Sequence, residues 1–283
     1  MGDLPPLREV IARHRLAARK GLGQHFLLDG NLTRKIARAA GDLTGATAIE
    51  VGPGPGGLTR ALLEGPARRV VAIERDRRCV AALNDLVARY PDRLEVIEGD
   101  ALKTDLVALA APPRHIVANL PYNISTALLT TWLERSADFA SMTLMFQKEV
   151  ARRLAATPGG REYGRLTIAA QWRCEVRLLF DVPPAAFVPA PKVTSTVVQL
   201  VPRPAPLCDA DPAVLTKVVA AAFGQRRKML RASLRTLPNA NAADLCAAAG
   251  LDPTARAEDI SIVGFCALAR AYLDRVSSPN GGP

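Results

Sequence analysis

An alternation of short apolar runs with longer helical stretches constrains this chain more than any other feature of its sequence. Between residues 47 and 200 of 283, five runs rich in aliphatic residues are separated by longer amphipathic stretches. This alternation is typical of an open, mainly parallel α/β sheet, because parallel strands need crossover connections. The runs are Thr47 to Val51, Arg69 to Ile73, Leu94 to Ile97, His115 to Ala118 and Met142 to Phe146.

The C-terminal part of the chain has a different pattern. Two more strand-like runs, 176–180 and 193–201, are separated by a proline-rich segment, so we expect an antiparallel pair that closes the sheet. Four prolines between residues 201 and 212 predict a linker, since proline continues neither a helix nor a central strand. The stretches 213–223, 226–237, 242–249 and 260–276 are helical in pattern and predict a small all-α domain.

We therefore expect four parts along the chain. Residues 1–28 precede a Rossmann-like α/β domain over 29–204, which is followed by the helical domain over 205–276 and a flexible tail over 277–283. The sequence contains no run of about 18 apolar residues, so we expect no membrane span. The N-terminus has no apolar region followed by a cleavage site, so we expect a cytoplasmic protein.

Charge and cysteine usage narrow the class of partner. Lys and Arg number 37 against 27 Asp and Glu, a formal net charge of +10, which favours nucleic acid or an acidic membrane face. The five cysteines are scattered and the three histidines lie far apart, so the sequence indicates neither a disulfide framework nor a metal site.

A glycine-rich turn follows the first strand-like run. Gly52, Gly54, Gly56 and Gly57 precede a helical pattern that begins at Leu58. Glycines allow a tight turn and let a ligand approach the helix N-terminus, which favours negative charge, so we expect a nucleotide-like ligand. The same glycines also satisfy the dinucleotide pattern G-x-G-x-x-G, so NAD is an alternative.

Acidic residues after the next two runs add to this pattern. Glu74 lies 18 positions after Gly56, where a carboxylate can accept hydrogen bonds from both ribose hydroxyls. Asp100 and Ala101 follow the third run, where Asp100 can accept from an adenine amino group. Together with Glu50 and the two prolines of the turn, which are similar to those of methyltransferases with this architecture, these residues favour S-adenosylmethionine over NAD.

The fourth run ends in Asn119-Leu120-Pro121-Tyr122. The exocyclic nitrogen of adenine shares its lone pair with the ring and is a poor nucleophile until it becomes pyramidal. The Asn119 side-chain oxygen and the Leu120 carbonyl can accept its two N–H bonds and stabilise that geometry. Tyr122 offers a face on which an unstacked base can lie. The motif predicts methyl transfer to an adenine amino group, without a general base.

Two basic tracts favour contact with RNA phosphates. At helical spacing Arg227, Arg231 and Arg235 are expected to share one face of the predicted helix 226–237. The first tract is Arg226, Arg227, Lys228, Arg231 and Arg235; the second is Lys148, Arg152, Arg153, Arg161 and Arg165.

Over nearly its whole length the chain resembles the ribosomal RNA adenine N6,N6-dimethyltransferases. The resemblance implies that Gln24, His25 and Leu27, within the segment 1–28, cover the methionine end of the cofactor, although many members have Asn in place of His25. It implies that Phe187 stacks on the target adenine opposite Tyr122. The motifs that carry it are Leu22 to Leu27, Glu50 to Gly57, Glu74, Asp100, Asn119 to Ile124, Phe187 to Val193 and Phe223 to Lys228.

The resemblance also implies the reaction. We expect S-adenosylmethionine-dependent dimethylation of two adjacent adenosines in a hairpin near the 3′ end of small-subunit (16S) rRNA. The substrate is expected to lie within the immature small ribosomal subunit. We expect the free protein to be a monomer that requires neither a metal nor a membrane. The alternatives are a large-subunit rRNA adenine methylase that confers macrolide resistance, a non-catalytic RNA-binding assembly factor and an NAD-dependent oxidoreductase.

Overall fold

The computed structural model describes residues 4–277 and divides into two compact units. The first contains the residues up to 151 together with 175–202, and the second contains 152–174 and the residues from 203 onward. The second unit therefore takes in a segment that the sequence places in the sheet domain. Tyr163, Ile168 and Trp172 are buried in the same hydrophobic cluster as the C-terminal helices, which explains this grouping. Residues 278–283 of the expected tail lie outside the described residues.

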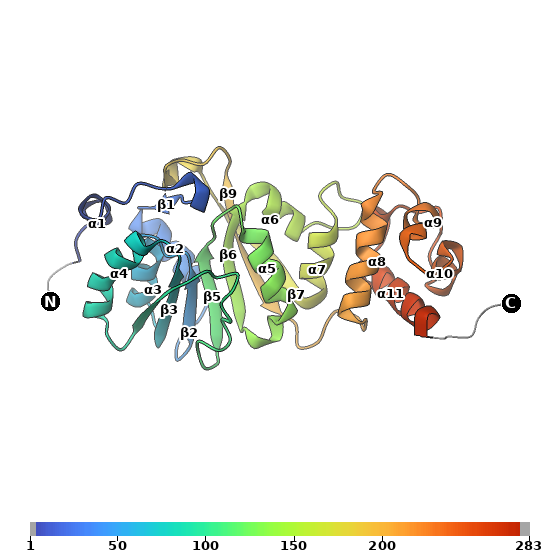
Figure 1. The fold of residues 1–283 in the computed structure, drawn as a ribbon, viewed down its shortest axis with the longest axis horizontal. Helices are drawn as coiled ribbons and strands as arrows, with labels where there is room; N and C mark the ends of the chain where they lie inside the picture. The colour runs from blue at the N-terminus through green and yellow to red at the C-terminus, as the bar shows by residue number, and fades with distance from the viewer. Residues whose placement is uncertain (1–3, 278–283) are drawn as a thin grey trace. The chain divides into compact units, whose positions relative to one another are not determined.

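A seven-stranded sheet forms the centre of the first unit (Figure 1). Its strand order is β4-β3-β2-β5-β6-β9-β7, and the first five of these strands are parallel to one another. β9 runs antiparallel to β6, and β7 lies beyond it at the edge. The expected α/β sheet is confirmed. The strands are β2 (Thr47–Val51), β3 (Arg69–Glu74), β4 (Leu94–Glu98), β5 (Arg114–Asn119), β6 (Ser141–Gln147), β7 (Cys174–Val182) and β9 (Ser195–Pro202).

The strand order reverses at β2, which lies between β3 and β5. All five residues of β2 are buried, as expected for a parallel strand covered on both faces. In open α/β sheets the ligand binds at the carboxyl ends of the strands beside such a reversal. The fold therefore directs attention to the loops that follow β2, β3 and β5.

Helices α2, α3 and α4 pack against the sheet through one hydrophobic cluster. Their residues Ile36, Leu62 and Leu83 share this cluster with Val70 of β3 and Val117 of β5. Aspartate side chains accept from the first backbone N–H groups of α2 and α4, as is common at helix N-termini. The helices of this unit are α1 (Leu7–Arg13), α2 (Gly30–Ala39), α3 (Gly57–Glu64), α4 (Arg77–Arg89), α5 (Ser125–Glu134) and α6 (Lys148–Leu154), which continues into the second unit.

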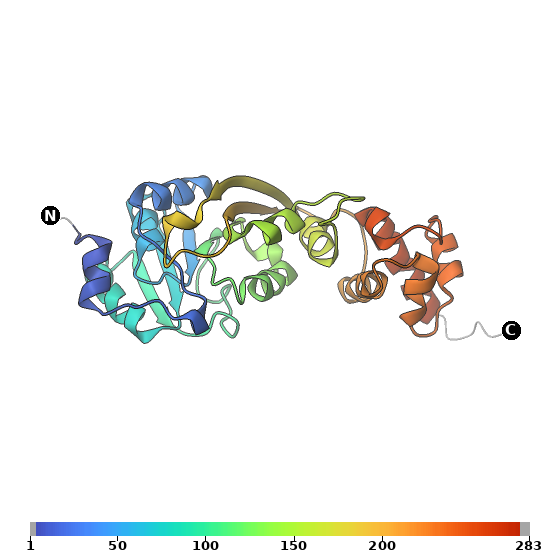
Figure 2. The ribbon, with the colours of Figure 1, turned by 90° about the horizontal axis from the view of Figure 1, so that it is seen from above.

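A second, two-stranded sheet brings distant segments together. β1 (Phe26–Leu27) pairs antiparallel with β8 (Phe187–Val188), with Leu27 opposite Phe187. The segment before β1 lies along α4, where Val10 and Phe26 pack against Cys79, and Figures 1 and 2 show α1 beside α4. The two-residue strands are too short to be predicted from sequence periodicity.

The second unit is helical, as expected, but the stretch predicted as one helix over 226–237 is helical only from Leu230 to Ser233 and, as a 3₁₀ turn, from Leu234 to Thr236. Residues 226–228 form a turn, Met229 makes an isolated bridge to Arg256, and Leu230 donates its backbone N–H to the Ala255 carbonyl at 2.8 Å. A continuous helix would have used that N–H internally. Within residues 4–277, no helix is long and apolar enough to cross a bilayer. The helices are α7 (Arg165–Arg173), α8 (Pro212–Gly224), α9 (Leu230–Ser233), α10 (Ala242–Ala248) and α11 (Ile262–Ser277).

Candidate active site

A cavity of about 1050 Å³, including its open mouth, lies at the carboxyl ends of β2, β3, β4 and β5. It is lined by residues 21–27 of the segment before and within β1, the glycine-rich loop, Glu74, Asp100 and residues 119–124. The structure thus brings the predicted cofactor residues and the predicted acceptor motif into one cavity. This matches the position expected from the strand reversal at β2.

The glycine-rich loop depends on backbone conformations that glycine adopts readily. Gly52, Gly54 and Gly56 have φ angles of 73°, 56° and 92°. A Cβ at Gly57 would lie 2.6 Å from the Leu27 carbonyl oxygen, so the loop and the segment that covers the cavity approach each other too closely for a larger residue. Such a loop at the start of α3 fits the close approach of a nucleotide-like cofactor.

Glu74 is the acidic residue at the end of β3 and is only 6% exposed. One carboxylate oxygen accepts from the Gly54 N–H at 2.9 Å, and the other accepts from the Asp76 N–H at 2.7 Å. Burial raises the pKa of this carboxyl. Each oxygen keeps a lone pair, so the fixed carboxylate fits the ribose hydroxyls of an adenosyl group.

Glu50 is buried below the same loop and is 1% exposed. Its carboxyl accepts a hydrogen bond from the Thr59 hydroxyl at 2.7 Å. Burial, and to a smaller extent the nearby Glu74, raise the pKa of Glu50 from 4.5 to about 8. The group is therefore protonated at neutral pH in the folded protein.

Glu50 gives the protein a testable dependence of stability on pH. The unfolded chain loses the Glu50 proton near pH 4.5, whereas the folded chain loses it near pH 8. The contribution of this carboxyl to the free energy of unfolding is therefore fully present below pH 4.5 and is lost as the pH rises to 8. We expect the free energy of unfolding to fall by roughly 5 kcal/mol over that pH range because of this group. Glu50→Gln should flatten the profile, measured by urea unfolding at several pH values. Parallel wild-type and variant profiles would contradict the assignment.

Asp100 and Ala101 follow β4, the strand next to β3, and line the same cavity. The Asp100 carboxylate accepts from the Leu102 N–H at 3.1 Å and lies 3.6 Å from the Arg75 guanidinium. Its side chain is 23% exposed, which leaves it accessible to an adenine amino group. Arg75 was not predicted from the sequence, because only the fold brings it next to Asp100.

The acceptor motif begins at the last residue of β5. Asn119 donates its amide to the His25 carbonyl at 3.1 Å, which fixes the carboxamide and leaves its oxygen available as an acceptor. Leu120 has a buried side chain, so it can serve the reaction only through its backbone carbonyl. The Tyr122 hydroxyl bonds to the Ser195 hydroxyl, which holds the ring in place.

His25 lines the cavity, as expected, whereas Phe187 does not lie where stacking on an acceptor base would require. The His25 ring stacks on Tyr122 with 5.4 Å between centroids, and its Nδ1 lies 2.7 Å from the Pro189 carbonyl oxygen. Phe187 is 2% exposed, belongs to the hydrophobic core and is not among the residues that line the cavity. Its ring meets the edge of His25 instead. In this structure His25, rather than Phe187, faces Tyr122.

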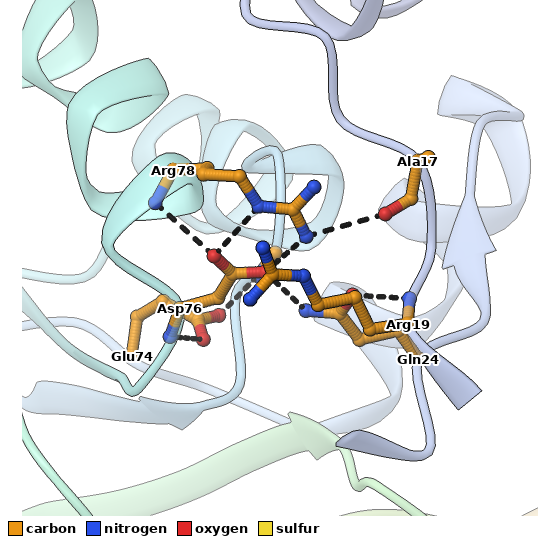
Figure 3. A network of polar contacts seen from close by, with 7 residues as sticks. Ala17, Arg19, Gln24, Glu74, Asp76 and Arg78 are labelled. Carbon is orange, nitrogen blue, oxygen red and sulfur yellow. Dashed lines mark hydrogen bonds and ion pairs between the residues drawn. The ribbon is translucent and has the colours of Figure 1, made fainter. Parts of the chain in front are cut away.

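The side chains of Gln24 and Leu27 are both committed to protein contacts, although both residues line the cavity. Gln24 bonds to the Arg19 N–H and to Asp76 (Figure 3). Leu27 is buried in the hydrophobic core. Asp76 and Arg78 are functional candidates that the sequence analysis missed. The available signal was an aspartate directly before a helical pattern, which is typical of a helix N-cap.

The residues of the two basic tracts all belong to the second unit, except Lys148, which belongs to the first. Arg226 bonds to the Arg161 carbonyl and, at 2.9 Å, to Glu258, so its charge is paired within the protein. Arg227 does not share a helical face with Arg231 and Arg235 as expected, because the helix begins only at Leu230. Arg152 is exposed and Arg153 half-buried. Among the described residues, no ion pair involves the exposed Arg227, Lys228, Arg231 or Arg235.

The strand order, the glycine-rich loop and the buried glutamate at the end of β3 define a Rossmann-like, S-adenosylmethionine-dependent methyltransferase. Within residues 4–277, no group of three or more His, Cys, Asp or Glu side chains is placed to hold a metal ion.

This chain belongs to the ribosomal RNA adenine dimethylase family, whose model matches residues 15–274. It is 62% identical over 271 residues to ribosomal RNA small subunit methyltransferase A of Rhodospirillum rubrum, covering 95% of this chain and 93% of the relative. A dimethyladenosine transferase from Plasmodium falciparum has a similar structure, with a TM-score of 0.75, 27% identity and coverage of 89% of this chain and 98% of that one. The 23S rRNA methyltransferase ErmE is similar with a TM-score of 0.65, 27% identity and coverage of 87% and 98%.

Proposed function

We propose that this protein transfers methyl groups from S-adenosylmethionine to the N6 amino groups of two adjacent adenosines in a hairpin near the 3′ end of small-subunit (16S) rRNA. The observation that carries the proposal is the position of Asn119–Tyr122 in the same cavity as Glu74 and Asp100. One cavity thus offers groups suited to an adenosyl cofactor and groups suited to an acceptor adenine. The 62% identity to a ribosomal RNA small subunit methyltransferase supports the choice of rRNA.

The residues of the cavity divide the work between binding and chemistry. Bound S-adenosylmethionine supplies a methyl group on a positively charged sulfur. Glu74 and Asp100 hold the ribose and adenine ends of that cofactor, while residues 24–27 cover it. The Asn119 oxygen and the Leu120 carbonyl accept the amino N–H bonds of the acceptor base and favour its pyramidal geometry. The methylated nitrogen then loses its proton to water, so no general base is required.

Tyr122 positions the base for both transfers. A base held by stacking on this ring keeps its amino group near Asn119, and stacking contributes about 1–3 kcal/mol per base in single-strand binding. After the first transfer the amine keeps one N–H, which one of the two acceptors can bind. Phe187 contributes through His25 in this arrangement, because its ring contacts His25, which lines the cavity and stacks on Tyr122.

The partner and place of action complete the proposal. We infer that the free protein is a monomer, that it acts in the cytoplasm and that it meets its RNA within the immature small ribosomal subunit. The net charge of +10 supports an RNA partner.

Identification of the labelled nucleoside tests the proposal. Purified protein is incubated with methyl-labelled S-adenosylmethionine and unmethylated small subunits, and the RNA is then digested to nucleosides. N6,N6-dimethyladenosine in small-subunit rRNA is the expected product. Label only in large subunits offered in parallel would favour the macrolide-resistance methylase. Absence of label with intact cofactor binding would favour a non-catalytic RNA-binding factor.

We further propose that the exposed basic residues of the second unit bind rRNA phosphates. Replacing Arg227, Arg231 and Arg235 together by alanine is expected to weaken RNA binding and to reduce the slope of log K against log[salt] by about 2 units, since each phosphate contact contributes about 0.7–0.9. Filter binding at several salt concentrations measures the slope. Arg13→Ala in the first unit is the control for loss of an exposed arginine. An unchanged slope would contradict the proposal.

A further inference from the structure

A single buried carboxylate connects the segment that covers the cavity to the strand that carries Glu74. Asp76 is 4% exposed. Gln24 donates its amide to one Asp76 oxygen at 3.1 Å, and the Arg78 guanidinium donates to both oxygens at 3.0 and 2.6 Å (Figure 3). A buried aspartate is costly unless it is paired and hydrogen-bonded, and this one is both.

Both partners of Asp76 extend the connection along the covering segment. The Gln24 side-chain oxygen accepts from the Arg19 N–H at 2.9 Å. Arg78 also donates to the Ala17 carbonyl at 3.2 Å. Residues 17, 19 and 24 are thus held to the start of α4 by contacts that converge on one side chain. We refer to Gln24, Asp76 and Arg78 as the Asp76 clip.

Asp76 also orients the acidic residue at the end of β3. Its backbone N–H donates to Glu74 at 2.7 Å, and this bond orients the carboxylate that faces the ribose. One residue therefore orients Glu74 through its main chain and the covering segment through its side chain. Glu74 and the covering segment are therefore both attached to Asp76.

We propose that the Asp76 clip is a positioning group that couples the covering segment to Glu74, so that cofactor affinity depends on Arg78 and on the Gln24–Asp76 bond. A segment that is already ordered over the site loses less conformational entropy when a ligand binds. By linkage, whatever orders the segment strengthens cofactor binding, and bound cofactor orders the segment in turn. The inference rests on the proposed function only for the identity of the cofactor.

The charge state of the clip supports this role. The bond from Arg78, together with that from Gln24, lowers the pKa of Asp76 to about 2. Asp76 also accepts from the Arg78 N–H at 3.1 Å as the N-cap of α4. A residue that only caps α4 would affect the stability of that helix and would have no specific effect on cofactor affinity. The capping role and the role in cofactor binding can therefore be measured separately.

Arg78→Ala tests the clip while leaving the Asp76 cap in place. We expect the Kd for S-adenosylmethionine, measured by calorimetry on the full chain without RNA, to rise about tenfold, because the covering segment loses a charge-assisted attachment and is less ordered before the cofactor binds. At saturating cofactor kcat should stay within about twofold, because Arg78 does not line the cavity. Arg77→Ala is the matched control: Arg77 is the preceding residue and pairs with Glu98 at the surface.

Hydrogen exchange supplies a readout that does not depend on binding. Amides of residues 17–24 should exchange faster in Arg78→Ala than in wild type or Arg77→Ala. Added cofactor should slow the exchange of these amides less in Arg78→Ala than in the other two proteins. Because Arg78 and Gln24 act through one carboxylate, Arg78→Ala combined with Gln24→Ala should weaken binding by less than the product of the single effects. Arg78→Lys should recover part of the affinity.

Specific outcomes would overturn the inference. An unchanged cofactor Kd in Arg78→Ala, or a lowered melting temperature with normal exchange at residues 17–24, would leave Arg78 as a structural residue of α4. Multiplicative effects in the double variant would also contradict coupling through Asp76. These measurements use no RNA, so their failure is distinguishable from failure of the rRNA substrate proposal.

Discussion

Replacing Asn119 with alanine is expected to lower kcat for methyl transfer by about 10²–10³-fold, while the cofactor Kd changes only a few-fold. The Asn119 oxygen binds the amino group most strongly when the nitrogen is pyramidal, so its loss raises the transition state more than the ground state. The amide of the same side chain is anchored on the His25 carbonyl, which fixes the direction of the oxygen.

Two further variants make the Asn119 prediction specific. Asn119→Asp keeps an acceptor but cannot donate to His25, so we expect activity between those of wild type and Asn119→Ala. Asn31→Ala is the control, because Asn31 is an exposed asparagine at the start of α2, outside the cavity. Single-turnover transfer to unmethylated small subunits measures the rate. Near-normal transfer by Asn119→Ala with intact cofactor binding would refute the role of the side-chain oxygen.

Replacing Glu74 with alanine is expected to weaken S-adenosylmethionine binding by at least about 100-fold, which corresponds to about 2.7 kcal/mol. The substitution removes the acceptor for the ribose hydroxyls. It also leaves the N–H groups of Gly54 and Asp76 without their present partner. Buried donors that lose a partner cost about 1–3 kcal/mol each, so the loop loses its fixed shape as well.

Glu98 provides the matched control for Glu74. The two glutamates are register partners on β3 and β4, but Glu98 is exposed and pairs with Arg77 at the surface. Glu98→Ala should bind the cofactor within about twofold of wild type, because a surface ion pair is worth at most about 1 kcal/mol. Calorimetry gives the affinities, and thermal unfolding shows whether each variant folds. Affinity within tenfold of wild type in folded Glu74→Ala would contradict the ribose assignment.

The amino-acid sequence by itself determined the features that depend on neighbouring residues. Strand periodicity predicted the five parallel strands. The glycine-rich turn after Val51 and the acidic residue that ends β3 predicted where a cofactor would lie. The strand prediction is confirmed, because strand pattern is local. The cofactor position stays a prediction, which rests on the fact that parallel strands place their carboxyl ends at one edge of a sheet.

Only the tertiary structure decided the features that depend on distant residues. The Leu230 backbone N–H bonds to the Ala255 carbonyl, and the helix expected from residue 226 begins only at Leu230. Pairing of β1 with β8 places Phe187 in the core and His25 against Tyr122. Gln24 reaches Asp76 across 52 positions of the chain. Such contacts form when separate segments fold onto one another, and neither composition nor periodicity records which segments will meet.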